Sequence, residues 1–293
     1  MLHVATHDGV FHADEVMACA VIRAVHPDTC VHITRTRDPK GYERADIVLD
    51  VGGVYNPAAR RFDHHQRGFD LVRQNGHPYA TAGLVWKEFG PVLCPDFAVW
   101  QEIDSALMEG IDAVDCGTAK RPPKGSPRTM SLSEVISGYN PPITQQEDAH
   151  FDADFIEAVE FAYGLLQRTI ERAEANRAAD ALVRDACAQA GTSTVVELPQ
   201  YLPWKQGVHV HAPTALYVVW PARDQWWLAA VPADPGSFTS KKPLPSAWCG
   251  LEGEALCEAL ALPDAVFCHR GGFIAAAKSR ESVMEMARRA LAV

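Results

Sequence analysis

The 293-residue sequence contains no uninterrupted apolar run of 18 or more residues, and this absence argues against a transmembrane helix. Its opening stretch, MLHVATHDGVFHADE, lacks the basic segment and the apolar segment of a secretory signal peptide. Internal repeats and low-complexity segments are also missing. We therefore expect a cytoplasmic globular protein that does not insert into membranes, and we leave open whether it forms a homodimer.

Paired cysteine motifs are absent as well, because none of the eight scattered cysteines forms a CxxC pattern. Without an export signal, these cysteines are expected to be reduced and mostly buried. The sequence also lacks a surplus of positive charge, since 27 Lys and Arg face 37 Asp and Glu, for a net charge of −10. Such a chain should not coat long nucleic acid, although an enzyme that grips a few phosphates locally remains compatible with this charge.

Hydrophobic patterning predicts an α/β fold in two domains. Strands are expected at residues 2–6, 30–37 and 46–53 and at the end of RRF before residue 63, with a helix over 14–25. Helices are further expected at 80–90 and 95–115, and a long amphipathic helix at 146–190. After Gly191 short strand-like segments and tryptophans become frequent, so we expect domains at 1–190 and 191–293.

Acidic residues and histidines gather where the predicted strands end or the predicted helices begin. Each group has an ordinary explanation by itself: turn formation, helix capping or a solvated helix face. Together they make up the ligand inventory of a two-metal centre, and mixed carboxylate and imidazole donors suit Mn²⁺ better than Mg²⁺, which stays the alternative. The candidate ligands are His7, His12, Asp14, Asp50, Asp63, His64, His65, Asp112 and Asp115.

The adjacent pair His64 and His65 raises a geometric question, because neighbouring side chains of an extended strand point to opposite faces. At the end of a strand or in a turn, both rings can instead point into one cleft. Asp112 and Asp115 raise a second question, because they are three residues apart and would share one face of a helix. The residues alone leave open which of the two acids is a ligand.

The segments HDGVFHADE, DVGG, DHH and DAVDCG, in this order, resemble the four motifs of the DHH phosphoesterase superfamily. That superfamily includes RecJ-type exonucleases, oligoribonucleases, cyclic-dinucleotide phosphodiesterases and one class of inorganic pyrophosphatase. The sequence is more similar to one branch, the melanocyte-proliferating-gene family. This closer resemblance adds RTRDP, DIVLDVGGVYNP, RRFDHHQRGF, TAGLVW, residues 243–251 and the H-x-x-GFI stretch near the C-terminus. It spans nearly the whole chain.

The resemblance implies a DHH-type catalytic domain with a parallel sheet and a smaller α/β domain that binds substrate. It implies that Asp50 bridges two metal ions, and that His64 or His65 contacts the substrate phosphate or orients the attacking water. The fourth motif of the superfamily points to Asp115 rather than Asp112, although Cys116 departs from the Thr or Asn expected after that aspartate. Asp8 and Glu15 are available to support the metal-bound imidazoles.

The C-terminal stretch from His269 to Glu281 is similar to the glycine-rich substrate loop of these enzymes, where backbone N–H groups approach phosphate closely. Ala275 and Ala276 stand where the family often has glycines. Arg35 and Arg61 could add phosphate contacts, and the Trp and Tyr residues around 201–227 are better explained as core than as base-stacking groups. The candidate substrate-binding residues are Arg67, His269, Arg270, Gly271, Gly272, Lys278 and Arg280.

The leading functional hypothesis is a manganese-dependent phosphodiesterase that acts as a 3′-5′ exonuclease on short RNA, an activity implied by the family resemblance. A pyrophosphatase or small-nucleotide phosphatase is the alternative within hydrolases. A protein that only binds metal or nucleotide is the alternative from another class. Substitution of a ligand discriminates these classes, because only a hydrolase has turnover to lose.

Overall fold

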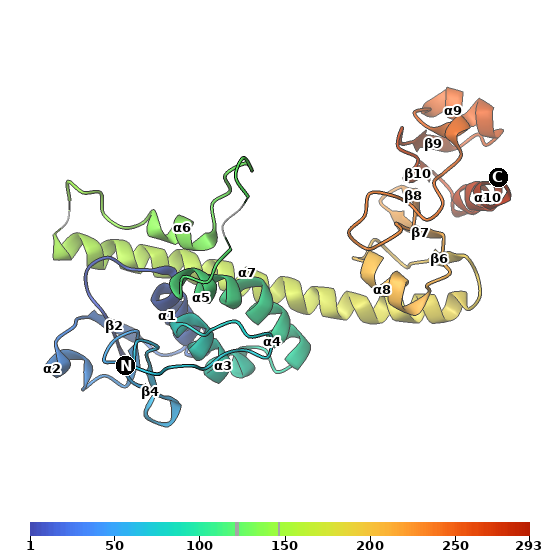
Figure 1. Cartoon of the computed structure of the whole chain (residues 1–293). Coiled ribbons are helices and arrows are strands. Elements are labelled where there is room, and N and C mark those ends of the chain that lie inside the picture. Colours follow the sequence, from blue (N-terminus) through green and yellow to red (C-terminus); the bar gives the residue numbers. More distant parts are fainter. Residues whose placement is uncertain (121–122, 146) are drawn as a thin grey trace. The chain divides into compact units, whose positions relative to one another are not determined.

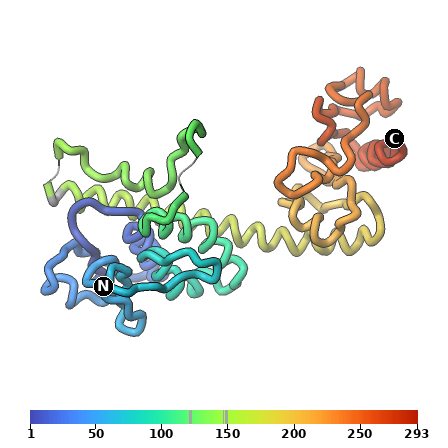
Figure 2. The backbone as a smooth tube through the Cα atoms, viewed as in Figure 1, coloured from blue at the N-terminus to red at the C-terminus, as the bar shows by residue number. Residues whose placement is uncertain are grey.

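The main chain forms two compact units, an N-terminal unit, Met1–Glu174, and a C-terminal unit, Ala175–Val293. The computed structural model describes residues 1–120, 123–145 and 147–293 (Figure 1). The boundary falls within the long helix α7 (Asp148–Ala190), which therefore contributes to both units, as the chain trace in Figure 2 shows. This helix confirms the one predicted at 146–190, except that it begins at Asp148: Glu147 is not helical, and Gln146 lies outside the described residues.

The N-terminal unit is built on a five-stranded sheet with the strand order β2-β1-β3-β5-β4. Its first four strands run parallel, and only the edge strand β4 is antiparallel to its neighbour. Parallel pairing places the carboxyl ends of β1, β3 and β5 along one edge. The strands are β1 (Leu2–Thr6), β2 (Val31–Arg35), β3 (Ile47–Leu49), β4 (Tyr55–Asn56) and β5 (Arg61–Phe62).

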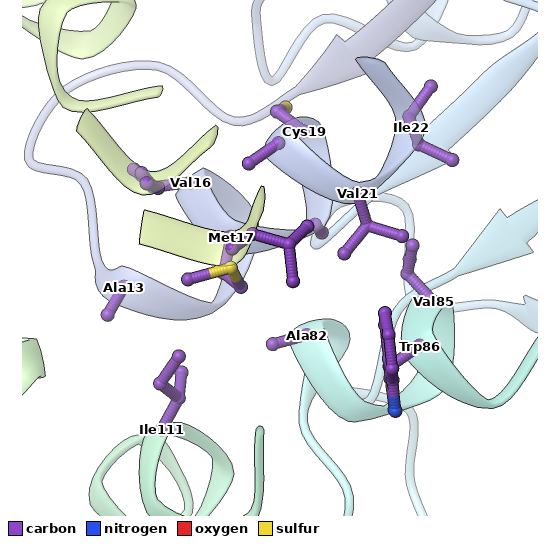
Figure 3. Packing of buried hydrophobic residues seen from close by; sticks show 14 of the residues in the cluster. Ala13, Val16, Met17, Cys19, Val21, Ile22, Ala82, Val85, Trp86 and Ile111 are labelled. Carbon is purple, nitrogen blue, oxygen red and sulfur yellow. The ribbon is translucent and has the colours of Figure 1, made fainter. Parts of the chain in front are cut away.

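Helices α1 and α3 pack together to form much of the core of the N-terminal unit. Met17 and Val21 of α1 lie near Ala82 and Trp86 of α3, all fully buried, and Figure 3 shows these side chains pointing toward one another. The early part of α7 completes the core through residues such as Phe155. The helices are α1 (Ala13–Val25), α2 (Pro39–Tyr42), α3 (Thr81–Leu93), α4 (Phe97–Ile103), α5 (Glu109–Asp115) and α6 (Leu132–Ser137), with a 3₁₀ turn at Pro57–Ala59.

The helix predicted over 95–115 differs from the structure, which has α4, a π-helical turn η2 (Asp104–Met108) and then α5. The irregularity has a local cause in a buried ionic network. Arg73 donates to both carboxylate oxygens of Asp104 at 2.8 and 2.9 Å and to Asp112 Oδ2 at 2.8 Å. Asp112 Oδ1 also accepts from the backbone N–H of Gly83 at 3.0 Å. This network sets where α5 lies against α3.

The C-terminal unit has a mixed five-stranded sheet, with order β6-β7-β8-β10-β9, in which only β6 and β7 are parallel. Trp204 and Trp220 are buried in its core, as the sequence favoured. No described helix, in either unit, is long and apolar enough to cross a membrane. Its elements are β6 (Val195–Glu197), α8 (Lys205–His211), β7 (Tyr217–Ala222), β8 (Gln225–Ala230), a 3₁₀ turn at Ser246–Trp248, α9 (Gly253–Leu260), β9 (Ala265–Cys268), β10 (Ile274–Ala277) and α10 (Arg280–Ala292).

The close approach of α3 to the Arg73 network predicts that Gly83→Ala destabilises the protein. The added methyl group would overlap Asp112 Oδ2 and lie 2.5 Å from Arg73 Nη2. We expect the free energy of unfolding to fall by about 1–3 kcal/mol, measured by urea denaturation. Gly110→Ala is the control, because its methyl group meets no atom within 4 Å and should stabilise α5 slightly. Equal stability of the two variants would contradict this account.

Candidate metal centre

Strand ends bring His7 and Asp50 together at the edge of the N-terminal sheet. His7 follows β1, and Asp50 follows β3, with its backbone in the left-handed region at φ 53°. His7 Nε2 lies 3.4 Å from Asp50 Oδ2, and Thr81 Oγ1 donates to Asp50 Oδ1 at 3.1 Å. A left-handed backbone at a non-glycine residue costs free energy and is characteristic of functional sites.

The first turn of α1 supplies two fully buried carboxylates, Asp14 and Glu15. Glu15 Oε1 accepts from the backbone N–H of His12 at 2.8 Å and lies 3.0 Å from His7 Nε2. The positive end of the helix dipole favours negative charge in this turn. Both oxygens of Asp14, and Glu15 Oε2, nevertheless have no hydrogen-bond partner among the described residues. Unpaired buried carboxylate oxygens call for a cation.

His64 and His65 follow the short strand β5 and both point toward Asp50. His64 Nε2 lies 3.5 Å and His65 Nδ1 3.3 Å from Asp50 Oδ1. The turn after the strand therefore brings neighbouring rings into one cluster. Asp63 accepts from the backbone N–H groups of Gly53 at 2.6 Å and His65 at 2.9 Å, so it holds this turn together. Its contact with the ring of His65, at 2.9 Å, orients that imidazole.

The last residue of α5, Asp115, joins the cluster, whereas Asp112 does not. Asp115 Oδ2 lies 3.0 Å from His64 Nε2, and Asp115 Oδ1 lies 3.9 Å from His12 Nδ1. Asp112 points to the other side, where Arg73 and the backbone of Gly83 bind both of its oxygens. Burial raises the pKa of Asp112 to about 7 despite the nearby Arg73. The geometry therefore favours Asp115 as the ligand from this helix.

Donor atoms within 4.8 Å of one another form four overlapping groups that could each hold a metal ion. Asp50, His64, His12 and Asp115 each belong to two of them, so the groups overlap in one cluster. Asp63 and Asp112 belong to none. The groups are His7, His12, Glu15 and Asp50; Asp50, His64 and His65; His64, Asp115 and Cys116; and His12, Asp14 and Asp115.

The electrostatics of the cluster show a site built for positive charge. Burial alone would lower the pKa of His7, but Asp50 and Glu15 outweigh it and raise the pKa to about 10. Asp115 and Asp50 likewise raise the pKa of His64 to about 12 against the effect of burial. Burial, together with the charge of Asp50, raises the pKa of Asp14 well above its usual range.

Asp50 behaves in the opposite way from Asp14. Although burial disfavours its charged form, contacts with His64, His65 and His7 hold the pKa of Asp50 well below its usual range. Asp50 is therefore the permanently charged centre around which the imidazoles gather. Metal-bound imidazoles need a partner for the second nitrogen. For His7 this is the carbonyl oxygen of Asp8, to which Nδ1 donates at 3.0 Å.

A pocket of about 360 Å³ adjoins the cluster, and His12, Asp14 and Asp115 line it together with Ser133 and Ser137. A second pocket, of about 700 Å³, lies in the C-terminal unit, and none of the clustered donors lines it. The pocket of about 360 Å³ therefore opens beside the clustered donors.

The predicted substrate residues of the C-terminal unit are spread over the β9–β10 hairpin and the start of α10. The backbone N–H groups of both glycines have internal acceptors, because Gly271 N donates to His269 Nδ1 at 3.0 Å and Gly272 N to the His269 carbonyl at 2.8 Å. Arg280 is held by Glu197 through two bonds of 2.7 and 2.6 Å. Arg270 and Lys278 remain exposed.

The three arginines considered in the N-terminal unit also differ in whether internal contacts hold their side chains. Arg35 donates to the carbonyl of Gly9 and packs over Phe155, and Arg61 donates to backbone carbonyls such as that of Ala45 at 3.1 Å. Both side chains therefore stabilise loops. Arg67 is exposed and makes no polar contact with the described residues, so it is the arginine free to meet a phosphate.

Comparison with known proteins identifies the family. A model of the MYG1 family, described as "Uncharacterised protein family (UPF0160)", matches residues 3–291. The chain belongs to this family. It is 36% identical to "MYG1 exonuclease" of Rattus norvegicus, covering 99% of this chain and 84% of that protein. It is 30% identical to "MYG1 protein C694.04c" of Schizosaccharomyces pombe, covering 99% and 98%.

A protein of Chlamydia pneumoniae, "MYG1 protein//CPj0489/CpB0509", is 33% identical, with 95% of this chain and 93% of that protein covered. Among solved structures, RecJ of Thermus thermophilus in complex with Mg²⁺ matches with a TM-score of 0.27 and 12% identity, over 99% of this chain and 50% of RecJ. MYG1 relatives therefore occur in animals, yeast and bacteria.

Two functional contacts of this MYG1-family chain were missed by sequence reasoning. Glu15 was expected only to support other ligands, yet its buried carboxylate is itself one of the clustered donors. Thr81, which binds Asp50, was not considered. The signal for Glu15 was present, because two adjacent acids in a helix that is otherwise buried and apolar cannot both be solvated.

The raised pKa values predict that the metal-free protein loses stability as the pH rises from 7 to 9. A histidine with a raised pKa stabilises the folded state fully below its unfolded value of 6.5, and that contribution is lost as the pH rises through the folded value, about 10 for His7. The pKa of Asp14 is also raised, so Asp14 acts in the same direction. The pKa of Asp50 is lowered, so its contribution to stability changes only at acidic pH.

Thermal unfolding of the chelated protein should therefore show a melting temperature that falls with pH by several degrees. One proton that is bound only in the folded state changes the free energy of unfolding by about 1.4 kcal/mol per pH unit. His7→Asn should flatten this slope, whereas His32→Asn, which changes an exposed histidine outside the cluster, should not. A melting temperature that rises over this range would contradict the charge balance described here.

Proposed function

We propose that this protein is a metal-dependent phosphodiesterase of the DHH type, a 3′-5′ exonuclease that acts on short RNA. The observation that carries the proposal is the centre around Asp50, where buried carboxylates with unpartnered oxygens meet three imidazoles at the carboxyl ends of parallel strands. The name of the animal relatives, "MYG1 exonuclease", supports a nuclease. The order of the HDGVFHADE, DVGG, DHH and DAVDCG motifs supports the DHH assignment.

The donor set fits two Mn²⁺ ions better than two Mg²⁺ ions, because it combines carboxylates with imidazoles. Asp50 would be shared between the ions, since it belongs to both the His7 group and the His64–His65 group. When bound, such ions would act as Lewis acids on the phosphodiester and make bound water more acidic. The proposed ligands are His7, His12, Asp14, Glu15, Asp50, His64 and Asp115.

The remaining steps fall to side chains of this chain. His65 is largely exposed and is oriented by Asp63, so we assign it to the substrate phosphate or to the attacking water. Asp50, kept ionised by its imidazole neighbours, holds the charge of the centre constant at neutral pH. Thr81 fixes the rotation of the Asp50 carboxylate. The pocket beside His12 and Asp115 admits water and one end of a chain.

We further propose that residues 1–190 form the catalytic domain and residues 191–293 bind the substrate. Exposed Arg67, Arg270 and Lys278 are the cations we assign to phosphate contacts. Arg280 would have to leave Glu197 before it could contribute. His269 packs at a tilt against Phe273, with ring centroids 4.4 Å apart, and places an aromatic ring beside Arg270.

The test is hydrolysis of a 5′-labelled short RNA by metal-stripped protein, with and without added Mn²⁺. We expect a manganese-dependent ladder that shortens from the 3′ end. Asp50→Asn should lower the rate by at least about 100-fold, comparable to the cost of misplacing reacting groups by roughly 1 Å. Asp70→Asn, the same change at an exposed aspartate outside the cluster, should retain the rate.

Intact RNA in the presence of Mn²⁺ would rule out the exonuclease, and pyrophosphate and nucleotides would then be tested as substrates. Cleavage that Asp50→Asn leaves unchanged would place the activity elsewhere. Shortening from the 5′ end, followed on a 3′-labelled RNA, would overturn the proposed polarity while keeping the metal centre.

Substituting the two acids of α5 one at a time distinguishes a metal ligand from a residue that stabilises the fold. Asp115→Asn should weaken Mn²⁺ binding by more than about tenfold, because even residues that only support a ligand contribute that much. Its melting temperature without metal should stay near that of the wild type or rise. Asp112→Asn should instead lower the free energy of unfolding by about 1–3 kcal/mol, because it leaves Arg73 partly unpaired in the core. Titration calorimetry and urea denaturation measure the two effects, and the reverse assignment of effects would make Asp112 the ligand.

A further inference from the structure

Cys116 places a sulfur atom beside the carboxylate and imidazole donors of the centre. It caps the C-terminal end of α5 directly after Asp115 and is half-buried. Its Sγ lies 4.0 Å from His64 Nδ1 and donates to the carbonyl oxygen of Tyr79 at 3.7 Å. The thiol is therefore the neighbour of the second nitrogen of His64, a position usually occupied by an oxygen acceptor.

Three different donor types meet at this point. A nitrogen of His64, a carboxylate oxygen of Asp115 and Cys116 Sγ all lie within 4.8 Å of one another. The other three groups of the centre contain only nitrogen and oxygen donors. A thiolate with an imidazole and a carboxylate is a ligand set for Zn²⁺, which binds three protein ligands and leaves its fourth position to solvent. Mn²⁺, a harder ion, gains little from sulfur.

We propose that His64, Asp115 and Cys116 form a site for a thiophilic divalent cation, Zn²⁺ in the first place, and that its occupation excludes manganese. The exclusion follows because Asp115 is shared: it also belongs to the donor group of His12 and Asp14, and it lies 3.9 Å from His12 Nδ1. A zinc ion that binds Asp115 withdraws it from that group. Its charge also disfavours a second cation beside His64 Nε2 and Asp50, which lie 3.5 Å apart. The inhibitory consequence rests on the proposed phosphodiesterase function, whereas zinc binding does not.

The site is reachable from solvent. Asp115 lines the pocket of about 360 Å³ beside the centre, and Cys116 is not fully buried. The backbone supports the arrangement, since Cys116 N donates to the carbonyl of Asp112 at 2.9 Å and so keeps the thiol at the end of the helix. On binding, the thiol proton passes to solvent and the sulfur becomes a ligand, so Cys116 gives this centre a selectivity that its nitrogen and oxygen donors lack.

Cobalt spectroscopy tests the site without any assay of activity. Co²⁺ added to the metal-free full chain should give the near-ultraviolet charge-transfer band of a cobalt–thiolate bond, and Zn²⁺ should abolish it. The band should be lost in Cys116→Ser and in Cys116→Ala, and kept in Cys30→Ser, which changes an exposed cysteine outside the cluster. Absence of the band from the wild type, or its survival in both Cys116 variants, would overturn the proposal.

Displacement of manganese tests the consequence. With Mn²⁺ bound, added Zn²⁺ should release free Mn²⁺, which is measured by its electron paramagnetic resonance signal, and should stop RNA hydrolysis. Cys116→Ser should raise the zinc concentration needed by about tenfold or more, the loss typical for a weakened metal site, and change manganese affinity little. Zinc that supports hydrolysis as well as manganese does would refute the inhibition. A chain that shows the cobalt band yet never cleaves RNA would refute the phosphodiesterase and leave the site standing.

Discussion

The structure of the N-terminal unit depends on one electrostatic constraint: carboxylates buried side by side must share positive charge. Asp14, Glu15 and Asp50 are withdrawn from water, and isolated buried charges of this kind cost several kcal/mol each. Protons on His7 and His64 supply part of the compensation, which is why their pKa values are raised so far. Among the described residues, the oxygens of Asp14 stay without a hydrogen-bond partner even so. A bound cation would complete this arrangement.

The fold meets this constraint because the ends of several strands and helices lie close together. Parallel strands β1, β3 and β5 end at one edge and deliver His7, Asp50 and the two histidines after Phe62. The start of α1 faces the same edge, so its dipole favours Asp14 and Glu15. Asp115 comes last along the chain, and α5, which carries it, is anchored by the bond of Arg73 to Asp112, three residues earlier. A salt bridge outside the centre thus positions a residue inside it.

The sequence was sufficient for those parts of the site that depend on local pattern. Strand ends followed by histidine or aspartate indicated the parallel α/β unit and brought the DHH segment to its edge, as the structure confirms. The sequence was insufficient where the position of a side chain depends on a partner far away along the chain. Asp112 and Asp115 are three residues apart on one helix, and the residues alone left both open, although the family resemblance favoured Asp115. The physical reason lies in the pairing of Asp112 with Arg73, 39 residues away, which turns Asp112 away from the centre. The same holds for Arg280, whose partner Glu197 is 83 residues away, and for the glycine N–H groups that His269 occupies.

The acidic composition and the proposed substrate are reconciled by where positive charge is placed. A chain of net charge −10 repels a long polyanion, and affinity for nucleic acid grows with the number of phosphates that are neutralised. Of the five arginines considered for phosphate contacts, Arg35, Arg61 and Arg280 are committed to internal contacts, which leaves Arg67 and Arg270. We infer that bound metal ions supply most of the attraction, and only at the reacting phosphate. Binding that depends on one phosphate rather than many gains little from a longer strand, which favours short RNA and chain ends over the interior of long molecules.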